Sequence, residues 1–211
     1  MIRYIFVKKL LPILVIFLTS LFIAGEALSL PNCVGTWSSS SWNNCFGHYT
    51  WTNGDQWIGD WKDGEIDGKG TYIYANESKF IGEYSEGERN GQGFMTWGDK
   101  TEWAGDEYVG EFINDERTGK GKYTFADGDE YVGEFRNGAM HGHGKYTFAD
   151  GDEYFGDFKD NVRHGLGSYY SIETSEWAGD KYTGEWEHGE MHGQGRYTFV
   201  DGTINEGIFE N

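Results

Sequence analysis

Regularly spaced carboxylates are the residues of this 211-residue chain best suited to acid–base chemistry. One acid returns at an equivalent position in successive segments: Asp60, Glu83, Glu111, Glu134, Asp157 and Glu185. A regular row of acids is typical of a solvated sheet face, whereas an active site is a singular group of residues. The sequence also contains no nucleophile elbow, phosphate-binding loop or metal-ligand motif. We therefore predict no enzyme and no cofactor.

Three histidines recur in the same way and raise the question of a metal site: His141, His164 and His192. Equivalent residues of successive hairpins lie about 10 Å apart, whereas zinc needs its ligand atoms about 2 Å from one centre. Two Asp-Gly-Asp-Glu segments, at 127–130 and 150–153, lack the ligand spacing of a calcium-binding EF-hand loop. Asp-Gly is a common hairpin turn pair, so we interpret these segments as turns and predict no metal.

These residues belong to one repeated segment that runs through most of the chain. Residues 108–130 and 131–153, for example, both begin with YVGEF and end with GKYTFADGDE. We divide the chain into six full copies, at 57–79, 80–107, 108–130, 131–153, 154–181 and 182–204. A degenerate copy at 30–56 precedes them as an N-terminal cap, and a partial copy at 205–211 follows.

Each copy has the residue pattern of a β-hairpin. Two runs alternate with the period of a strand: Tyr131, Gly133 and Phe135 in the first, and Gly144, Tyr146 and Phe148 in the second. A longer glycine-bearing loop at 137–142 joins the runs, and an Asp-Gly turn leads to the next copy. No helical periodicity follows the leader, and no proline follows Pro31. The expected fold is all-β: an extended, single-layer antiparallel sheet of tandem hairpins.

The structural glycines predict a register for these hairpins. If Phe135 lies opposite Gly144, then Gly133 lies opposite Tyr146, with Gly156 of the next copy on the other side of the Tyr146 ring. A ring would then lie over a glycine on each neighbouring strand. The same register would form ion pairs on the other face, joining Glu134 to Lys145, Glu111 to Lys122 and Glu185 to Arg196.

The frame Y-x-G-x-[FW]-x-x-G…H-G-x-G-x-[YF]-x-[FW]-x-[DN]-G resembles the MORN repeat, over residues 57–209 and more loosely from 33. The resemblance implies an extended antiparallel β-ribbon that acts in scaffolding, dimerisation or attachment at membranes, with phosphoinositide binding suggested for some members. We expect one face of the ribbon to carry structural aromatic residues, including Tyr131, Phe135, Tyr146, Phe148, Tyr182 and Trp186.

Two cysteines, Cys33 and Cys45, fall in the degenerate first copy. A disulfide between them would protect the N-terminal edge of the sheet, where a repeat protein needs a cap. The alternative is two free cysteines that lie too far apart to bridge.

Two nearly identical insertions make the copies at 80–107 and 154–181 five residues longer than the others. The first contains Glu102 and Trp103, and the second contains Glu176 and Trp177. Both lengthen the turn between consecutive copies, so they would project from the same edge of the ribbon. We expect a two-point contact site for a partner, because Trp is enriched among interface anchors. The alternative is that each Trp folds back over its own hairpin.

Residues 1–29 have the layout of a cleaved, helical signal peptide: a basic start, an apolar run at 10–24 and small residues before Leu30. The apolar run is shorter than the roughly 20 residues that a membrane span needs, although an uncleaved membrane anchor is the alternative. Cleavage would take the net charge from −18 to −20, because it removes three basic residues and one acidic residue. The mature protein would be periplasmic or secreted.

The composition, with 35 Asp and Glu against 17 Lys and Arg, limits the partners. A nucleic-acid binder needs a basic face, so no nucleic acid is expected. The same charge opposes direct binding to anionic lipid. We predict a non-catalytic scaffold that binds proteins, including a second copy in a homodimer, outside the cytoplasm. The alternatives are a membrane-attachment module that inserts its aromatic face into phospholipid, and a binder of extended glycans.

Overall fold

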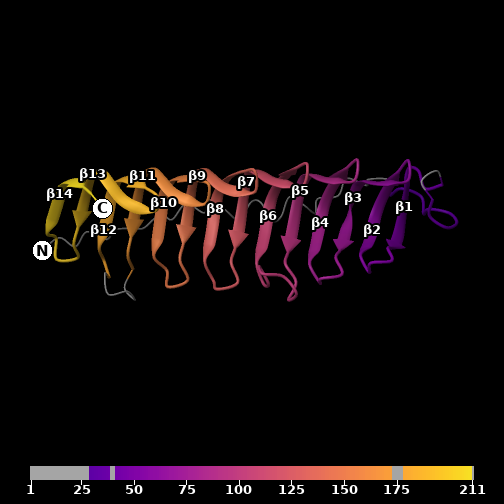
Figure 1. Ribbon diagram of the computed structural model, residues 1–211, viewed down its shortest axis with the longest axis horizontal. Coiled ribbons are helices and arrows are strands. Elements are labelled where there is room, and N and C mark those ends of the chain that lie inside the picture. Colours follow the sequence, from indigo (N-terminus) through magenta and orange to yellow (C-terminus); the bar gives the residue numbers. More distant parts are fainter. Residues whose placement is uncertain (1–28, 39–40, 173–177, 211) are drawn as a thin grey trace, which may run out of the picture.

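The computed structural model describes residues 29–38, 41–172 and 178–210. It contains one antiparallel sheet of 14 strands, which follow one another in sequence order (Figure 1). The predicted all-β ribbon of tandem hairpins is confirmed, whereas the predicted signal-peptide helix lies outside the described residues. No helix in the described part of the chain is long and apolar enough to span a membrane.

The strands are β1 (Cys45–Thr50), β2 (Gln56–Lys62), β3 (Glu65–Ile73), β4 (Lys79–Ser85), β5 (Glu88–Thr96), β6 (Glu107–Ile113), β7 (Glu116–Thr124), β8 (Glu130–Arg136), β9 (Ala139–Thr147), β10 (Glu153–Lys159), β11 (Val162–Tyr170), β12 (Lys181–Glu187), β13 (Glu190–Thr198) and β14 (Ile204–Phe209).

A two-residue turn closes each hairpin. Between β8 and β9 it consists of Asn137 and Gly138, whose φ angles are +50° and +78°. Positive φ at both positions is typical of a type I′ turn, whose twist matches that of the flanking strands. The longer loop predicted at 137–142 is therefore wrong, because residues 139–142 belong to β9.

Each hairpin also contains a β-bulge, which shifts the register along the pair. In β8–β9, Gly133 lies opposite Gly144, but the next residue, Glu134, lies opposite His141. The two β9 residues between these partners pair with β10 only. One of them, Gly142, has a φ of +58°, and a Cβ atom there would lie 2.1 Å from Oε2 of Glu134. The bulge therefore requires the glycine of the His-Gly pair.

The bulge and the tight turn make the predicted register wrong, by four residues between the turn and the bulge and by two residues beyond the bulge. Tyr146 lies opposite Tyr131, and Phe135 lies opposite Met140, so neither ring faces the expected glycine. The predicted ion pairs are wrong for the same reason: Lys145 lies opposite Val132, Lys122 opposite Val109 and Arg196 opposite Thr183. Lys145 instead forms an ion pair of 2.7 Å with Glu153 of the next hairpin, and Lys122 one of 2.5 Å with Glu130.

A buried ring at the start of each first strand lies over glycines of its own hairpin. A Cβ atom at Gly133 or at Gly144 would lie 2.3 Å from an atom of Tyr131, which is fully buried. The Tyr131 hydroxyl donates hydrogen bonds to the backbone carbonyls of Glu134 (2.9 Å) and His141 (3.2 Å), at the bulge. A ring does lie over the glycines, but it comes from the first strand, not the second. Equivalent fully buried residues are Trp57, Phe80, Tyr108, Tyr154, which lies over Gly156, and Tyr182.

A second set of tyrosines links the turns between hairpins, except the turn between β3 and β4, to the hairpin that follows. The Tyr197 hydroxyl donates a hydrogen bond to Asp180 at 2.7 Å, and the other oxygen of Asp180 accepts the Val200 backbone N–H at 2.8 Å. Burial, together with this hydrogen bond, raises the pKa of Tyr197 to about 12. Equivalent pairs are Tyr72 with Asp55, Tyr123 with Asp106, Tyr146 with Asp129, and Tyr169 with Asp152.

The N-terminal edge of the sheet is covered by the chain that precedes β1. Cys33 and Cys45, the pair expected from the sequence, form a disulfide with an S–S distance of 2.04 Å. Phe46 accepts a backbone hydrogen bond from Cys33 and donates one to Pro31, both at 2.8 Å. Trp42 is buried against this end of the sheet. The outer edge of β1 is thus occupied by the preceding chain at Phe46.

Candidate protein-binding surface

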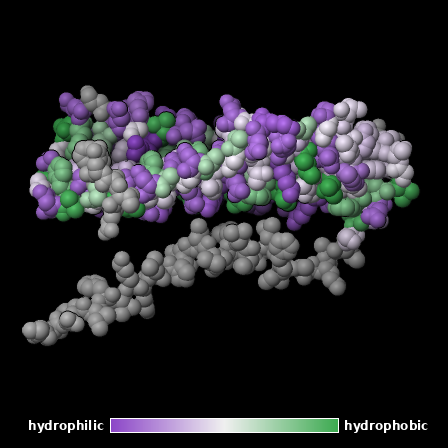
Figure 2. Space-filling view, turned by 90° about the horizontal axis from the view of Figure 1, so that it is seen from below, coloured by the Kyte–Doolittle hydropathy of each residue, from purple (hydrophilic) through white to green (hydrophobic). Residues whose placement is uncertain are grey.

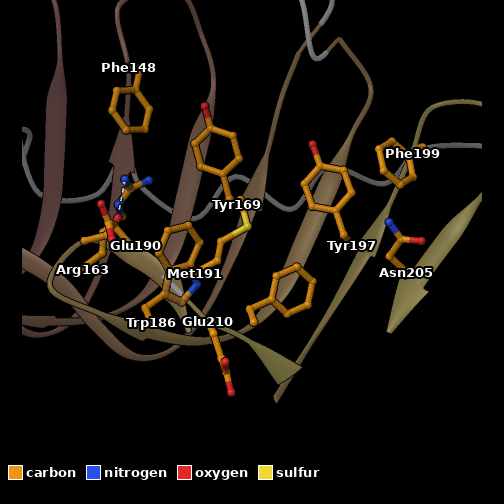
Figure 3. Close-up of a pocket in the computed structure, with 12 residues that line it drawn as sticks. Phe148, Arg163, Tyr169, Trp186, Glu190, Met191, Tyr197, Phe199, Asn205 and Glu210 are labelled. Atoms are coloured by element: carbon orange, nitrogen blue, oxygen red, sulfur yellow. Dashed lines mark hydrogen bonds between the residues drawn. The ribbon is translucent and has the colours of Figure 1, made fainter. Parts of the chain in front are cut away.

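The strands bend near their bulges, so the ribbon forms a trough along its length (Figures 1 and 3). Rings pack edge-to-face inside it, as Tyr131 does with Phe158 of the next hairpin at 4.9 Å between centroids. Of the predicted aromatic face, the buried members are Tyr131, Phe135, Tyr182 and Trp186, and the partly buried ones are Tyr146 and Phe148. Most of the aromatic surface is therefore covered by the protein itself.

Arginines close further parts of the trough. The Arg117 guanidinium carbon lies 4.9 Å from the ring centroid of Tyr123, and Nη2 donates a hydrogen bond to the Gly138 carbonyl at 2.6 Å. Arg163 lies 4.5 Å from the Trp186 ring centroid and donates to the turn of the next hairpin in the same way. A cation over aromatic faces contributes about 0.5–2 kcal/mol, more when water is excluded. Each of these arginines thus holds one hairpin to the next.

A hollow of about 980 Å³ opens in the trough between β9 and β14 (Figure 3). The hollow is open to solvent and is not an enclosed cavity. The lining combines rings with a few polar groups: Phe148, Arg163, Tyr169, Trp186, Gly189, Glu190, Met191, Tyr197, Phe199, Asn205, Phe209 and Glu210.

One ring of a regular row is missing between Phe148 and Phe199, two residues that line the hollow. The residue that follows the second strand of each hairpin is a half-buried aromatic at Trp51, Tyr74, Trp97, Phe125, Phe148 and Phe199. Ser171 holds this position after β11, between Phe148 and Phe199. Ring contacts run without a break from Trp97 to Tyr169. Within the described residues, no ring contact then joins Tyr169 to Tyr197.

Trp186, which lines the hollow, has an unpaired hydrogen-bond donor. Trp186 is 4% exposed, and its indole N–H has no hydrogen-bond partner. Trp61, at the equivalent position near the N-terminus, donates its indole N–H to the Gly47 carbonyl at 3.3 Å. Leaving a buried donor unpaired costs about 1–3 kcal/mol. The Trp186 N–H is therefore a buried, unpaired donor next to the hollow.

Of the predicted contact residues of the insertions, the two in the first insertion lie on a different part of the molecule from the hollow. Trp103 is 51% exposed and Glu102 is also exposed, on the turn between β5 and β6. Trp177 and Glu176 lie outside the described residues, so the two-point contact stays a prediction. Figure 2 shows the edge formed by these turns, where hydrophilic residues are interspersed with small hydrophobic groups.

The repeated acids and histidines have local roles at the bulges. Asp157, for example, accepts the Leu166 backbone N–H at 3.1 Å and lies 2.7 Å from Nδ1 of His143. Among the described residues, no group of three or more His, Cys, Asp or Glu side chains is placed to hold a metal ion.

Sequence reasoning missed the aspartate–tyrosine links, the arginines over the rings and the gap at Ser171. Signals for them were present, because each linked aspartate precedes its tyrosine by 17 residues. Ser171 departs from an otherwise aromatic position, which an alignment of the six copies displays.

An open sheet of tandem hairpins built on one recurring frame defines a β-repeat protein. A family model described as the MORN repeat matches residues 46–56, 57–79, 80–102, 108–130, 131–153, 154–172 and 182–204. These seven matches cover well over half of the chain, and the chain belongs to the MORN-repeat family.

A comparison with curated proteins finds no match. Among solved structures, the chain is similar to the SAS-4 (dCPAP) TCP domain of Drosophila melanogaster, solved in complex with a proline-rich motif of Ana2 (dSTIL). The identity is 9% and the TM-score 0.45, over 77% of this chain and 83% of that one. A mutant TCP10 domain of Danio rerio CPAP is 13% identical with a TM-score of 0.23, over 77% and 99% of the two chains. At these scores the likeness carries no functional argument.

Proposed function

We propose that this chain is a non-catalytic protein-binding module that acts outside the cytoplasm and holds its partner in the hollow beside Ser171. The observation that carries the proposal is the break in the aromatic row between Phe148 and Phe199. Ring contacts join Trp97 to Tyr169 along the trough, whereas among the described residues none joins Tyr169 to Tyr197, and both of these tyrosines line the hollow. Aromatic residues and arginine are the side chains that most often anchor protein interfaces.

Two observations support a location outside the cytoplasm. The first 29 residues have the composition of a secretory leader. The disulfide between Cys33 and Cys45 suits an oxidising compartment, since cytosolic thiols are kept reduced. Fractionation of cells that express the full chain, with mass determination of the mature N-terminus, tests this location and the expected cleavage near Ser29.

A substitution that adds the missing ring tests the binding site. In Ser171→Phe the new ring would complete the row, because Phe125 and Phe148 each contact the tyrosine two strands further on. Ser168→Phe is the matched control: it adds the same ring three residues away, where Ser168 and Thr183 pair on the opposite face. In cross-linking in the source organism, we expect wild type and Ser168→Phe to retain a partner that Ser171→Phe loses. Equal cross-linking by all three proteins would contradict the proposal.

Liposome co-sedimentation separates this function from membrane attachment. The net charge of −18 should repel anionic lipid, so we expect no binding to neutral or anionic vesicles at low or high salt. Salt-insensitive sedimentation with vesicles would instead support insertion of aromatic side chains. Mass measured over a range of protein concentrations would show whether the partner is a second copy of the chain.

A further inference from the structure

We propose that the outer face of β10, β11 and β12, which points away from the trough, binds an amphipathic helix of a partner protein whose apolar side is flanked by Lys or Arg. This is a second site and goes beyond the proposed function, because it lies on the opposite face of the sheet from the hollow. Three features of the outer face support it: an exposed apolar patch, the width of that patch and the charges beside it.

The apolar patch consists of Phe155, Leu166 and Tyr170. Phe155 is 59% exposed and Leu166 is 67% exposed, the highest values among the large apolar side chains of β1–β13. Phe155 lies opposite Ser168 of β11, and Leu166 and Tyr170 stand two residues before and after Ser168 on the same face. The hydroxyl groups of Ser168 and Thr183 hydrogen-bond to each other at 3.0 Å. A partner would therefore meet apolar side chains around hydroxyl groups that are already paired.

The patch arises where this copy departs from the repeat frame. Leu166 stands between the two glycines of its strand, where the other full copies have a polar or charged side chain: Lys69, Gln92, Lys120, His143 and Gln194. Among the second strands of the six full copies, β11 alone has no Lys, Arg, Asp or Glu on its outer face. The combination of Phe155, Leu166 and Tyr170 is thus a property of this copy and not of the ribbon as a whole.

The width of the patch suits one helix and not a second sheet. An apolar sheet face is buried against either helices or another sheet. Neighbouring strands lie about 4.8 Å apart, so β10 to β12 span about 10 Å, close to the diameter of about 10–12 Å of an α-helix with its side chains. In the row that contains Phe155, the next strands on either side carry Lys145 and Arg196. A second sheet, including that of a second copy, would have to cover these two charges and would bring together two chains of −18.

The acids beside β11 favour a basic helix. Glu185 of β12 lies opposite Leu166, and Asp157 of β10 lies opposite His164, so one acid stands on each side of this strand. Among the described residues, neither carboxylate forms an ion pair with Lys or Arg. The net charge of −18 also attracts a basic partner over a longer range. Lys or Arg side chains along the apolar side of a helix would meet these two acids while its apolar residues cover Leu166.

Peptide titration with the purified protein, followed by calorimetry, tests the inference. The probe is a 14-residue peptide of Leu and Lys whose leucines recur at i, i+3, i+4 and i+7, so that they form one side of a helix. One control peptide has the same composition in an order without helical period, and the other has Glu in place of Lys. We expect saturable binding of the Leu-Lys helix and at least tenfold weaker binding of both controls. No binding of the Leu-Lys helix, or equal affinity for the reordered peptide, would overturn the inference.

Three variants locate the binding. Leu166→Gln introduces the residue that two other copies have at this position, so it should fold, and we expect it to weaken binding at least tenfold. Ile113→Gln is the matched control: it removes an apolar side chain that is 55% exposed at the end of β6, and it should not change binding. Glu185→Gln should weaken binding several-fold at low salt, because it removes one of the two acids. Thermal unfolding confirms that each variant is folded, and unchanged binding by folded Leu166→Gln would refute the site.

The hollow is tested separately from this patch. Ser171→Phe changes the trough side of the sheet, so it should leave binding of the Leu-Lys helix unchanged. Loss of binding in Ser171→Phe but not in Leu166→Gln would place the peptide in the trough and overturn the inference. If the peptide does not bind but cross-linking to a partner still depends on Ser171, the inference fails and the proposed function stands.

Discussion

Adding one methyl group to a glycine under a buried ring should destabilise the ribbon, whereas adding it to an equivalent glycine without a covering ring should not. Gly133→Ala places a Cβ atom 2.3 Å from the Tyr131 hydroxyl oxygen and 2.6 Å from Cα of Gly144. Carbon atoms prefer separations of about 3.5–4.0 Å, so Tyr131 must move or the two strands must separate. The matched control is Gly207→Ala in β14, at the same position of the frame, where no atom lies within 4 Å.

The magnitude follows from the contacts that Tyr131 would lose. Overpacking a close-packed site costs about 1–3 kcal/mol. Displacing the hydroxyl also weakens its hydrogen bonds to the carbonyls of Glu134 and His141, each contributing about 1 kcal/mol. We expect Gly133→Ala to lower the free energy of unfolding by about 2–5 kcal/mol. Gly207→Ala should be neutral or stabilising by up to about 1 kcal/mol, because alanine restricts the unfolded chain.

Urea unfolding followed by circular dichroism measures both variants. Repeat arrays can unfold in parts, so hydrogen exchange at β8 and β9 should accompany it. We expect faster exchange in that hairpin for Gly133→Ala and wild-type exchange for Gly207→Ala. Equal urea midpoints for the two variants would refute the conclusion that glycine is required beneath the buried rings.

Three further predictions concern the cap, the indoles and the tyrosine hydroxyls. Replacing Cys33 and Cys45 by Ser should lower stability by about 3 kcal/mol through the freed loop, with the largest rise in hydrogen exchange at β1; uniform exchange would contradict a capping role. Trp186→Phe should cost less stability than Trp61→Phe in urea unfolding, because only Trp61 has a hydrogen-bonded indole; the reverse order would contradict the unpaired donor. Stability should fall above pH 10, because unfolded tyrosines release their protons near there, whereas the pKa of folded Tyr197 is about 12; a urea midpoint constant from pH 9 to 11.5 would contradict this.

The sequence was sufficient to predict the hairpins, because the period of two and the turn residues are local signals. The pairing register of the two strands was not predictable by the same means, because it depends on the length of the turn and on the position of the bulge. Asn137-Gly138 closes the hairpin in two residues, and the bulge at Gly142 adds two residues to one strand only. The ring-over-glycine arrangement was predicted, but the choice between Tyr131 and Tyr146 depends on that bulge.

The aspartates of the turns show the same limit. Asp129 was correctly placed in a turn, but the sequence alone gives no reason to connect it to Tyr146, 17 residues further on. The connection exists because the inter-repeat turn and the end of the next hairpin lie on one edge of the sheet. A contact of this kind follows from the three-dimensional repeat, not from any local pattern.

In this repeat protein the residues that match the repeat motif make the contacts that hold the hairpins together. The hydroxyl of the motif tyrosine, as in Tyr131, donates a hydrogen bond to a backbone carbonyl at the bulge, and the motif glycine, as in Gly133, leaves room for the tyrosine ring. The motif aspartate, as in Asp129, accepts a backbone hydrogen bond from the end of the next hairpin. Specific recognition must therefore come from positions where a copy departs from the frame. Ser171 is such a departure, since it leaves out a ring between Phe148 and Phe199 and adds no compensating ring contact among the described residues. Restoring the ring should thus make the ribbon more regular and remove its binding site, which a merely structural role for Ser171 does not predict.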